Sequence, residues 1–170
     1  GLYRNVHVIV TKDIHVPVWG TYITTPFVSK EYASVNLKTE IENSNGQDVR
    51  IVTEIRDAND KVVVTKDNTQ KINHGKPFEQ NFIVDNPQLW SPENPYLYNA
   101  VSKRYIKDRL VDEYTSRFGV RDTKVRGDKG CFLNGERRKD QGVCNHHDLG
   151  PLGAAINVAA LRRQLTMLKD

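Results

Sequence analysis

The chain has 170 residues and a formal net charge of +4, with 38% hydrophobic and 27% charged residues. This balance indicates a globular protein with a sizeable core and excludes an intrinsically disordered chain. No apolar run approaches the roughly 20 residues that a membrane-spanning helix needs, and no charged-then-apolar leader is visible. We therefore expect no membrane partner and no export signal within these residues.

The basic residues and the cysteines do not form recognisable sites. The densest basic cluster, Arg137 to Lys139, is flanked by Glu136 and Asp140, whereas nucleic-acid binding usually needs a concentrated basic face. Cys131 and Cys144 lack the CxxC spacing of zinc or redox sites, and two cysteines are too few for a disulfide scaffold. We expect no nucleic-acid partner and no cysteine-based site.

Two segments in the first third of the chain alternate between apolar and polar residues, as half-buried strands do. The inward positions are Val35, Leu37, Thr39 and Ile41 in residues 33–43, and Val49, Ile51, Thr53 and Ile55 in residues 48–57. The Asn45–Gly46 step between them is typical of a hairpin turn, because both residues tolerate a positive φ. The sequence therefore predicts a β-hairpin made of these two strands.

Further strands are predicted downstream, separated by turn-rich links. They cover residues 62–66, 78–84, 97–106 and 110–118. Short strands without helical periodicity between them favour an antiparallel β-sandwich of about seven strands, which would span residues 17–123. The paired cysteines of antibody domains are missing, so the pattern indicates the architecture alone.

The stretch DNPQLWSPENPYLY, residues 85–98, interrupts this series of strands. Its three prolines are incompatible with a central strand, whereas Trp90, Tyr96 and Tyr98 are too apolar for a plain surface loop. We predict an ordered crossover that packs against one end of the sandwich.

The pattern changes after Val120. A short hairpin is predicted around Asn134–Gly135. Near the end of the chain, one stripe of an amphipathic helix, with Asn157 as its N-cap, is indicated by Val158, Leu161, Leu165 and Leu168. Residues 124–170 are too few to close a core of their own, so we interpret them as the first segment of a larger α/β domain.

Three stretches of the sequence together resemble glycoside hydrolase family 2, which includes β-galactosidases, β-glucuronidases and β-mannosidases. GLYRNVHVIV, residues 1–10, resembles the last strand of the family's N-terminal jelly roll. LWSPENPYLY, residues 89–98, and RFGVR, residues 117–121, resemble the crossover and the exit of its immunoglobulin-like domain. FLNGERRKDQGVCNHHDLGPLG, residues 132–153, is similar to its first barrel segment, which is built around Leu-Asn-Gly and Gly-Val-Asn-Arg-His.

The resemblance covers essentially the whole chain in the family's order. It implies a mainly β chain in which an immunoglobulin-like antiparallel β-sandwich is followed by the truncated start of a (β/α)8 barrel. In this division, residues 1–16 are the last jelly-roll strand and a linker, residues 17–123 are the sandwich, and residues 124–170 are the first segment of the TIM-barrel catalytic domain.

The resemblance also implies a sugar-binding loop. Gln141 to Val143 would be the first barrel strand, and functional groups of such barrels lie just beyond the C-terminal ends of the strands. His146 matches the family's motif and is expected to hold sugar hydroxyls, since an imidazole can both donate and accept a hydrogen bond. Three neighbours complete the candidate substrate-binding set: Asn145, where many relatives have arginine, and His147 and Asp148, which would line the pocket rim or brace the loop.

Two other interpretations of the histidine run remain. A metal site is disfavoured, because consecutive side chains of an extended segment point to opposite faces and do not converge on one ion. On pattern alone, ordinary polar loop residues are the favoured interpretation, and the family resemblance reverses this for His146 only. We therefore predict no metal and no cofactor.

The resemblance implies a retaining glycosidase that cleaves terminal β-galactosides, with β-glucuronides or β-mannosides as alternative substrates. Such enzymes use two carboxylates roughly 5 to 5.5 Å apart. In the family both glutamates lie on later barrel strands, so we expect these residues to contain no catalytic residue and to be inactive alone. The expected partner of the full-length protein is a carbohydrate, while homo-oligomer formation and the compartment, bacterial cytoplasm or periplasm, are left open. A non-catalytic immunoglobulin-like spacer or interaction module is the alternative from another functional class.

Overall fold

The computed structural model describes residues 4–43, 46–72, 75–139, 142, 146 and 149–169. The chain divides into two compact units. The larger unit is Thr11–Lys139, and the smaller unit combines Gly1–Val10 with Asp140–Asp170.

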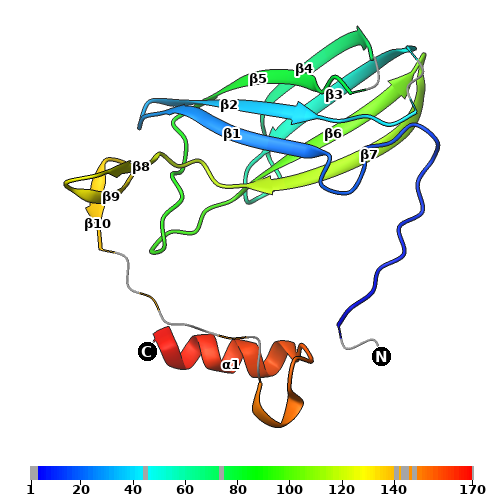
Figure 1. Ribbon diagram of the computed structural model, residues 1–170. Helices are drawn as coiled ribbons and strands as arrows, with labels where there is room; N and C mark the ends of the chain where they lie inside the picture. Colours follow the sequence, from blue (N-terminus) through cyan, green and yellow to red (C-terminus); the bar gives the residue numbers. More distant parts are fainter. Residues whose placement is uncertain are drawn as a thin grey trace. The chain divides into compact units, whose positions relative to one another are not determined.

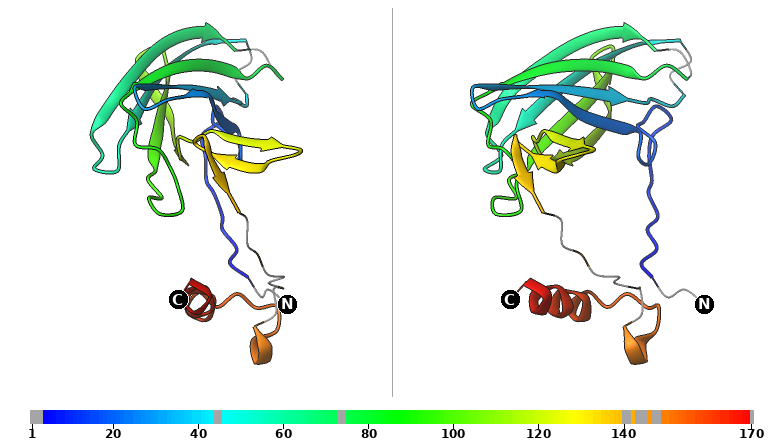
Figure 2. Two further views of the ribbon diagram at one scale, coloured as in Figure 1. Left: turned by 90° about the vertical axis from the view of Figure 1, so that its left-hand side faces the viewer. Right: turned by 60° about the vertical axis from the view of Figure 1, so that its left-hand side comes forward.

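The larger unit contains a two-layer antiparallel β-sandwich (Figures 1 and 2). One sheet has three strands in the order β1 (Thr21–Val28), β2 (Tyr32–Thr39), β5 (Phe78–Asp85). The other sheet has four strands in the order β4 (Val62–Lys71), β3 (Asp48–Arg56), β6 (Tyr98–Ile106), β7 (Arg109–Phe118). The mainly β, immunoglobulin-like sandwich predicted from the sequence is confirmed, as are its strands in residues 33–43, 48–57, 62–66, 78–84, 97–106 and 110–118.

β1 is a strand that the sequence pattern did not reveal. Pro26 interrupts its segment, TYITTPFV, and proline is normally excluded from a regular ladder. The structure accommodates it with a register shift between Thr24 and Phe27 in the pairing of β1 with β2. A bulge at a sheet edge tolerates the missing N–H of proline.

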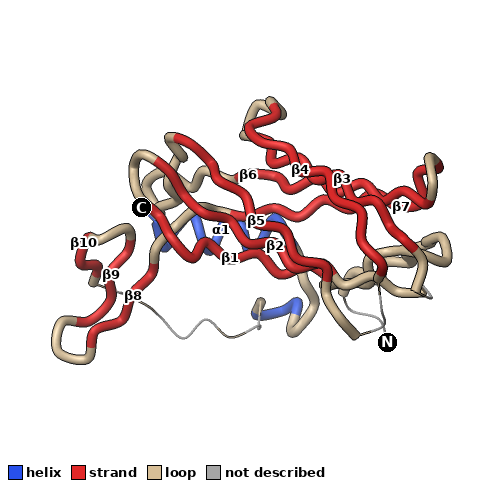
Figure 3. Tube along the Cα trace, turned by 90° about the horizontal axis from the view of Figure 1, so that it is seen from above, coloured by secondary structure: helices blue, strands red, loops and turns tan. Residues whose placement is uncertain are grey.

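The structure corrects the predicted hairpin at Asn45–Gly46. β2 pairs with β1 and β5, whereas β3 pairs with β4 and β6, so the two strands lie in different sheets (Figure 3). Residues 40–47 connect the two sheets, and Glu42 forms a bridge with His15 on the way. Asn45 lies outside the described residues. The prediction was wrong because alternation shows that a strand has one buried face but does not show which strand lies beside it.

The predicted inward faces of β2 and β3 are nonetheless buried, from opposite sheets. They contribute to two apolar clusters. The first is Ala33, Val35, Leu37, Ile55, Phe82, Val84, Tyr98, Ala100, Phe118 and Val120, and the second is Ile41, Val49, Ile51, Ile72 and Phe78. On β3 the inward position between the two clusters is Thr53, and its hydroxyl lies 2.7 Å from Gln80 Oε1 and 2.9 Å from Ser102 Oγ. A hydrogen-bonded polar layer therefore separates the clusters.

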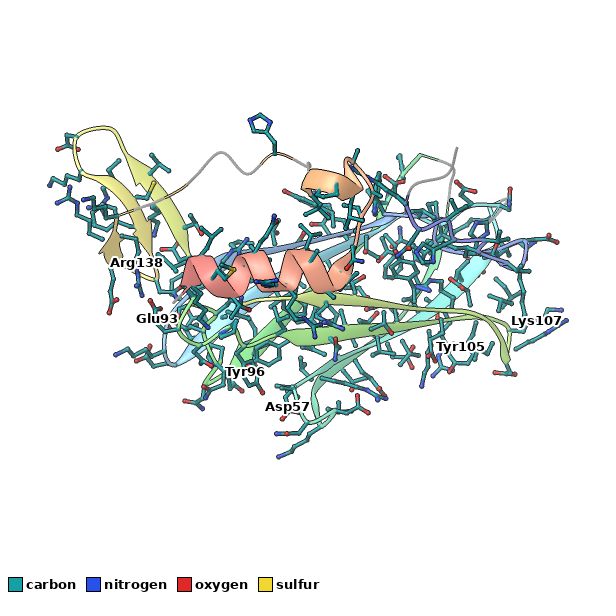
Figure 4. All side chains as sticks on the ribbon, turned by 90° about the horizontal axis from the view of Figure 1, so that it is seen from below. Asp57, Glu93, Tyr96, Tyr105, Lys107 and Arg138 are labelled. Atoms are coloured by element: carbon teal, nitrogen blue, oxygen red, sulfur yellow. The ribbon has the colours of Figure 1, made fainter. Side chains whose placement is uncertain are left out.

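The proline-rich segment, residues 85–98, is an ordered crossover at the end of the sandwich, as predicted. The Trp90 N–H donates to the carbonyl oxygen of Val120 at 2.8 Å. The hydroxyl of Tyr98, which is buried in the first cluster, accepts a hydrogen bond from the Gln88 N–H at 2.8 Å. The Tyr96 hydroxyl accepts from the Ala58 N–H at 3.2 Å (Figure 4).

A small antiparallel sheet follows the sandwich within the larger unit. Its strands are β8 (Thr123–Arg126), β9 (Gly130–Leu133) and β10 (Glu136–Arg138), in the order β10-β9-β8. Asn134 and Gly135, with φ of 52° and 84°, form the turn between β9 and β10, so the predicted hairpin is confirmed. The assignment of residues 124–170 to a barrel domain stays a prediction. The first of these residues, 124–139, belong to the larger unit together with the sandwich.

The smaller unit contains a 3-10 turn, η1 (Gly150–Leu152), and the helix α1 (Val158–Lys169). The Ala160 N–H donates to Asn157 Oδ1 at 3.0 Å, which confirms the predicted N-cap. Three residues of the apolar stripe, Val158, Leu165 and Leu168, are each 59% exposed. No helix among the described residues is long and apolar enough to cross a membrane.

Residues 4–10 show no strand pairing within the described part of the chain. A strand needs a hydrogen-bonded neighbour, and the apolar side chains of Val8 and Val10 are 89% and 91% exposed. That these residues are the last strand of a jelly-roll domain stays a prediction.

Candidate functional site

The candidate sugar-binding loop belongs to the smaller unit. His146, the residue that matches the family motif, is exposed. Asn145, His147 and Asp148 lie outside the described residues, so the assembly of the four candidate residues into one site stays a prediction. Among the residues that the structure describes, no cluster of three or more His, Cys, Asp or Glu could hold a metal ion.

The segment after the candidate loop forms a compact turn. The Leu149 N–H donates to the carbonyl oxygen of Gly153 at 2.9 Å, and the Gly153 N–H donates to that of Gly150 at 2.9 Å. Gly150 and Gly153 have positive φ values of 62° and 55°, which glycine adopts without steric cost. This turn lies between the candidate loop and α1 along the chain, and the assignment of these segments to a barrel stays a prediction.

The best-defined group of motif residues lies in the larger unit, where the crossover meets the end of β7. A Cβ atom on Gly119 would come within 2.9 Å of Cβ and Cγ of Trp90, so a larger residue at position 119 would collide with the indole. The guanidinium carbon of Arg121 lies 4.9 Å from the Trp90 ring centroid, within cation–π range. The LWSPENPYLY and RFGVR stretches are therefore packed against each other.

Asn134 joins the crossover and Asp122, the residue after the RFGVR stretch, to the turn between β9 and β10. Its side-chain Nδ2 donates to the carbonyl oxygen of Trp90 at 3.0 Å. Its Oδ1 accepts from the Asp122 N–H at 3.0 Å, and its own N–H donates to the Asp122 carbonyl oxygen at 2.8 Å. One asparagine thus connects the crossover, the sandwich exit and the small sheet.

A second connection links the crossover to the end of β10. Arg138 Nη1 donates to Glu93 Oε1 at 2.7 Å, and Nη2 donates to Oε2 at 3.0 Å (Figure 4). The two parallel hydrogen bonds define the relative orientation of the groups better than a single contact would. The hydrogen bonds from Arg138 lower the pKa of the Glu93 carboxyl, and Glu93 raises the pKa of the Arg138 guanidinium.

We name these contacts the exit corner: Trp90, Gly119 and Arg121, the bridging Asn134 with Asp122, and the Glu93–Arg138 pair.

The family model for glycosyl hydrolases family 2 matches residues 15–121. The chain belongs to glycoside hydrolase family 2.

Individual family 2 relatives match beyond the sandwich. The β-galactosidase BoGH2A of Bacteroides ovatus is 40% identical over 100% of this chain and 20% of its own length. A β-glucuronidase of Formosa agariphila is 30% identical over 84% of this chain and 16% of its own length. The crystal structure of a family 2 member from Bacteroides cellulosilyticus superposes with a TM-score of 0.84 at 33% identity, over 94% of this chain and 22% of that one. The chain spans about a fifth of the length of these relatives.

The family 2 assignment made from the sequence motifs is confirmed. Sequence reasoning did not reveal that Asn134 contacts Trp90 or that Glu93 pairs with Arg138. The Leu-Asn-Gly motif indicated that Asn134 could have a role of its own, because a motif residue in a turn can make contacts beyond the turn. Trp90 lies 44 residues before Asn134 and Glu93 lies 45 residues before Arg138, and pattern alone does not show such distant contacts.

Proposed function

We propose that these residues are part of a retaining β-glycosidase that cleaves terminal β-galactosides. The observation that carries the proposal is the 40% identity to a β-galactosidase over the full length of the chain. The 30% identity to a β-glucuronidase supports β-glucuronides as the alternative substrate. The proposal of β-mannosides as substrates rests on the family resemblance alone.

The roles that we propose for individual residues follow from barrel geometry. Retaining hydrolysis needs one carboxylate to attack the anomeric carbon and one to protonate the leaving oxygen, and we expect both outside these residues. His146, on the loop after the first barrel strand, would hydrogen-bond a sugar hydroxyl as the ring flattens toward the transition state. Asn145, His147 and Asp148 would line or brace the same loop. This loop would therefore bind and position the sugar, and the glycosidic bond would be cleaved by residues outside this chain.

The full-length protein should be assayed with chromogenic β-galactoside, β-glucuronide and β-mannoside, and the anomer released first should be identified by NMR. We expect turnover of the β-galactoside with retention, and no turnover by the 170-residue chain. If the full-length protein hydrolyses none of the three substrates, the non-catalytic spacer is favoured.

The role of His146 can be separated from the activity as a whole. In the full-length enzyme, His146→Ala should lower kcat/KM by an amount that corresponds to about 1 to 3 kcal/mol, the cost of a lost polar contact to the substrate. His7→Ala, at another exposed histidine, is the matched control and should leave kcat/KM unchanged. Wild-type kinetics in His146→Ala would remove this residue from the site.

A further inference from the structure

A groove runs along one side of the sandwich, where the two sheets meet at their edges. β1 is the last strand of the three-stranded sheet on this side, and β7 is the last strand of the four-stranded sheet. Side chains hold the two edges together. The hydroxyl oxygens of Thr21 and Ser116 lie 2.7 Å apart, and the Thr25 hydroxyl donates to the Arg121 carbonyl oxygen at 2.7 Å.

We name this feature the seam groove. It lies between residues 22–25 of β1 and the segment 117–123, with Trp90 of the crossover in its wall. Its volume is about 740 Å³, which is within the roughly 300 to 1,000 Å³ that ligand pockets occupy. The groove is formed entirely by the larger unit. It therefore has the size of a ligand site within one compact unit.

Two guanidinium groups line the seam groove without a carboxylate partner. Arg117 and Arg121 are both exposed, and neither side chain forms an ion pair or a hydrogen bond with any residue that the structure describes. Asp122, the one carboxylate among the described lining residues, is already paired with Lys124, whose Nζ lies 2.7 Å from its Oδ2. The groove is therefore positively charged and suits an anionic ligand.

Arg121 is ordered before any ligand arrives, because it is stacked on Trp90. Its guanidinium carbon lies 4.9 Å from the centroid of the ring. The indole is in turn fixed by the contact with Gly119 and by the hydrogen bond from the Trp90 N–H to Val120. A stacked guanidinium keeps its planar fork of N–H donors at its edge, and this fork matches a carboxylate or a tetrahedral oxyanion. Less conformational freedom is then lost on binding.

The rest of the lining offers hydroxyl groups more than apolar surface. The hydroxyls of Tyr22, Thr24 and Thr123 have no hydrogen-bond partner among the described residues. Phe118 is only 9% exposed and Trp90 is covered by the arginine, whereas a protein partner usually needs an apolar centre to its interface. Tyr22 is 66% exposed, so its ring offers a flat surface to the C–H face of a sugar. Hydroxyls, cations and one exposed ring together match an acidic sugar.

We propose that the seam groove binds an anionic sugar unit of a polysaccharide. Arg121 holds the carboxylate or sulfate group through its fork, and Arg117 adds a second positive charge. The hydroxyls of Tyr22, Thr24 and Thr123 hydrogen-bond the hydroxyls of the sugar. Binding in the groove requires no glycosidase activity, so this inference stands independently of the proposed function.

The test measures binding of polysaccharides to the full-length protein by affinity gel electrophoresis and isothermal titration calorimetry. The probes are polygalacturonate, dextran sulfate and uncharged dextran. We expect saturable binding of an anionic probe and none of dextran, and the probe that binds more tightly identifies the anionic group as a carboxylate or a sulfate. If neither anionic probe binds, the proposal is overturned.

Substitutions of the two arginines test the site itself. Arg117→Gln and Arg121→Gln should each weaken binding by roughly tenfold or more, because a contact with a charged group is lost. Arg121→Lys keeps the charge but loses the planar fork, and it should also bind more weakly. If Arg121→Gln lowers the thermal midpoint, Arg117→Gln decides, because its exposed side chain has no partner in the described part of the chain.

The matched control is Arg109→Gln, which removes the same charge from an exposed position at the other end of β7. It should keep the wild-type affinity. An equal loss of affinity in Arg109→Gln and Arg117→Gln would mean that the probe responds to net charge alone. That result, or wild-type affinity in both groove variants, contradicts the proposal.

The fluorescence of Trp90 reports whether the probe occupies the groove. The 170-residue chain has two tryptophans, and Trp19 is 91% exposed, so Trp19→Phe leaves Trp90 as the only one. The anionic probe should change the fluorescence of this variant in a saturable way, and adding Arg117→Gln should shift the titration to higher probe concentrations. Binding without any change in fluorescence places the probe elsewhere. Binding to the 170-residue chain but not to the full-length protein means that another part of the protein fills the groove, and either result overturns the proposal.

Discussion

Replacing Asp112 with alanine should leave a buried arginine without its counter-ion. The Arg104 side chain is 0% exposed, and its Nη1 lies 2.9 Å from Asp112 Oδ2. The same carboxylate oxygen accepts the Val16 N–H at 3.0 Å. Within the described part of the chain, Nε and Nη2 of Arg104 have no hydrogen-bond partner. Burial lowers the pKa of Arg104 to about 10, although Asp112 raises it, so the guanidinium is charged at neutral pH. Asp112 is the carboxylate to which it is hydrogen-bonded, and its Nη1 also donates to the Ser102 carbonyl oxygen at 3.2 Å.

The size of the effect follows from the burial of the pair. Removing one partner of a buried ion pair typically costs about 3 to 5 kcal/mol, because the remaining charge is left desolvated. Loss of the hydrogen bond to the Val16 N–H adds about 1 kcal/mol. A domain of ordinary stability has about 5 to 15 kcal/mol in total, so Asp112→Ala should bring the sandwich close to unfolding.

Equilibrium urea unfolding of the 170-residue chain, followed by tryptophan fluorescence, measures this loss. Replacing both residues, as Arg104→Met with Asp112→Ala, should recover most of it, because a packed apolar side chain no longer needs a counter-ion. The neighbouring Lys103–Glu113 pair, 3.9 Å apart with side chains 31% and 50% exposed, provides the control: Glu113→Ala should cost at most about 1 kcal/mol. The reasoning is refuted if Asp112→Ala loses less than about 1 kcal/mol, or if the double variant is no more stable than the single one.

Two further predictions concern the exit corner. Gly119→Ala should destabilise the chain by about 1 to 3 kcal/mol in urea unfolding, because the new methyl group collides with Trp90, whereas Gly127→Ala, with open space around it, should not. Titration followed by carboxyl-carbon NMR should find the Glu93 pKa below its ordinary range in the wild type and closer to that range in Arg138→Gln, where the hydrogen bond with Ser91 still lowers it. Because the folded-state pKa is the lower one, the pair stabilises the fold above the ordinary carboxyl pKa, and this contribution is lost as the pH falls through the folded value.

The sequence by itself determined which side of β2 and of β3 is buried and which family the chain belongs to. Alternation identified the inward faces of β2 and β3, and three motifs in order identified family 2. These features depend on residues that are close together in the chain or on short motifs, and the order of the residues shows both directly. Asn157 was likewise recognisable as an N-cap, because a cap bonds to an N–H within the next turn.

Tertiary structure alone decided which segments meet. The Asn45–Gly46 step signalled a turn, yet β2 and β3 belong to opposite sheets, because strands with one apolar face can bury it equally well side by side or across a core. The same holds for the exit corner. The roles of Asn134 and Glu93 depend on partners distant in the chain, and only packing of the crossover against the sandwich end brings their hydrogen-bonding groups within 3.0 Å of one another.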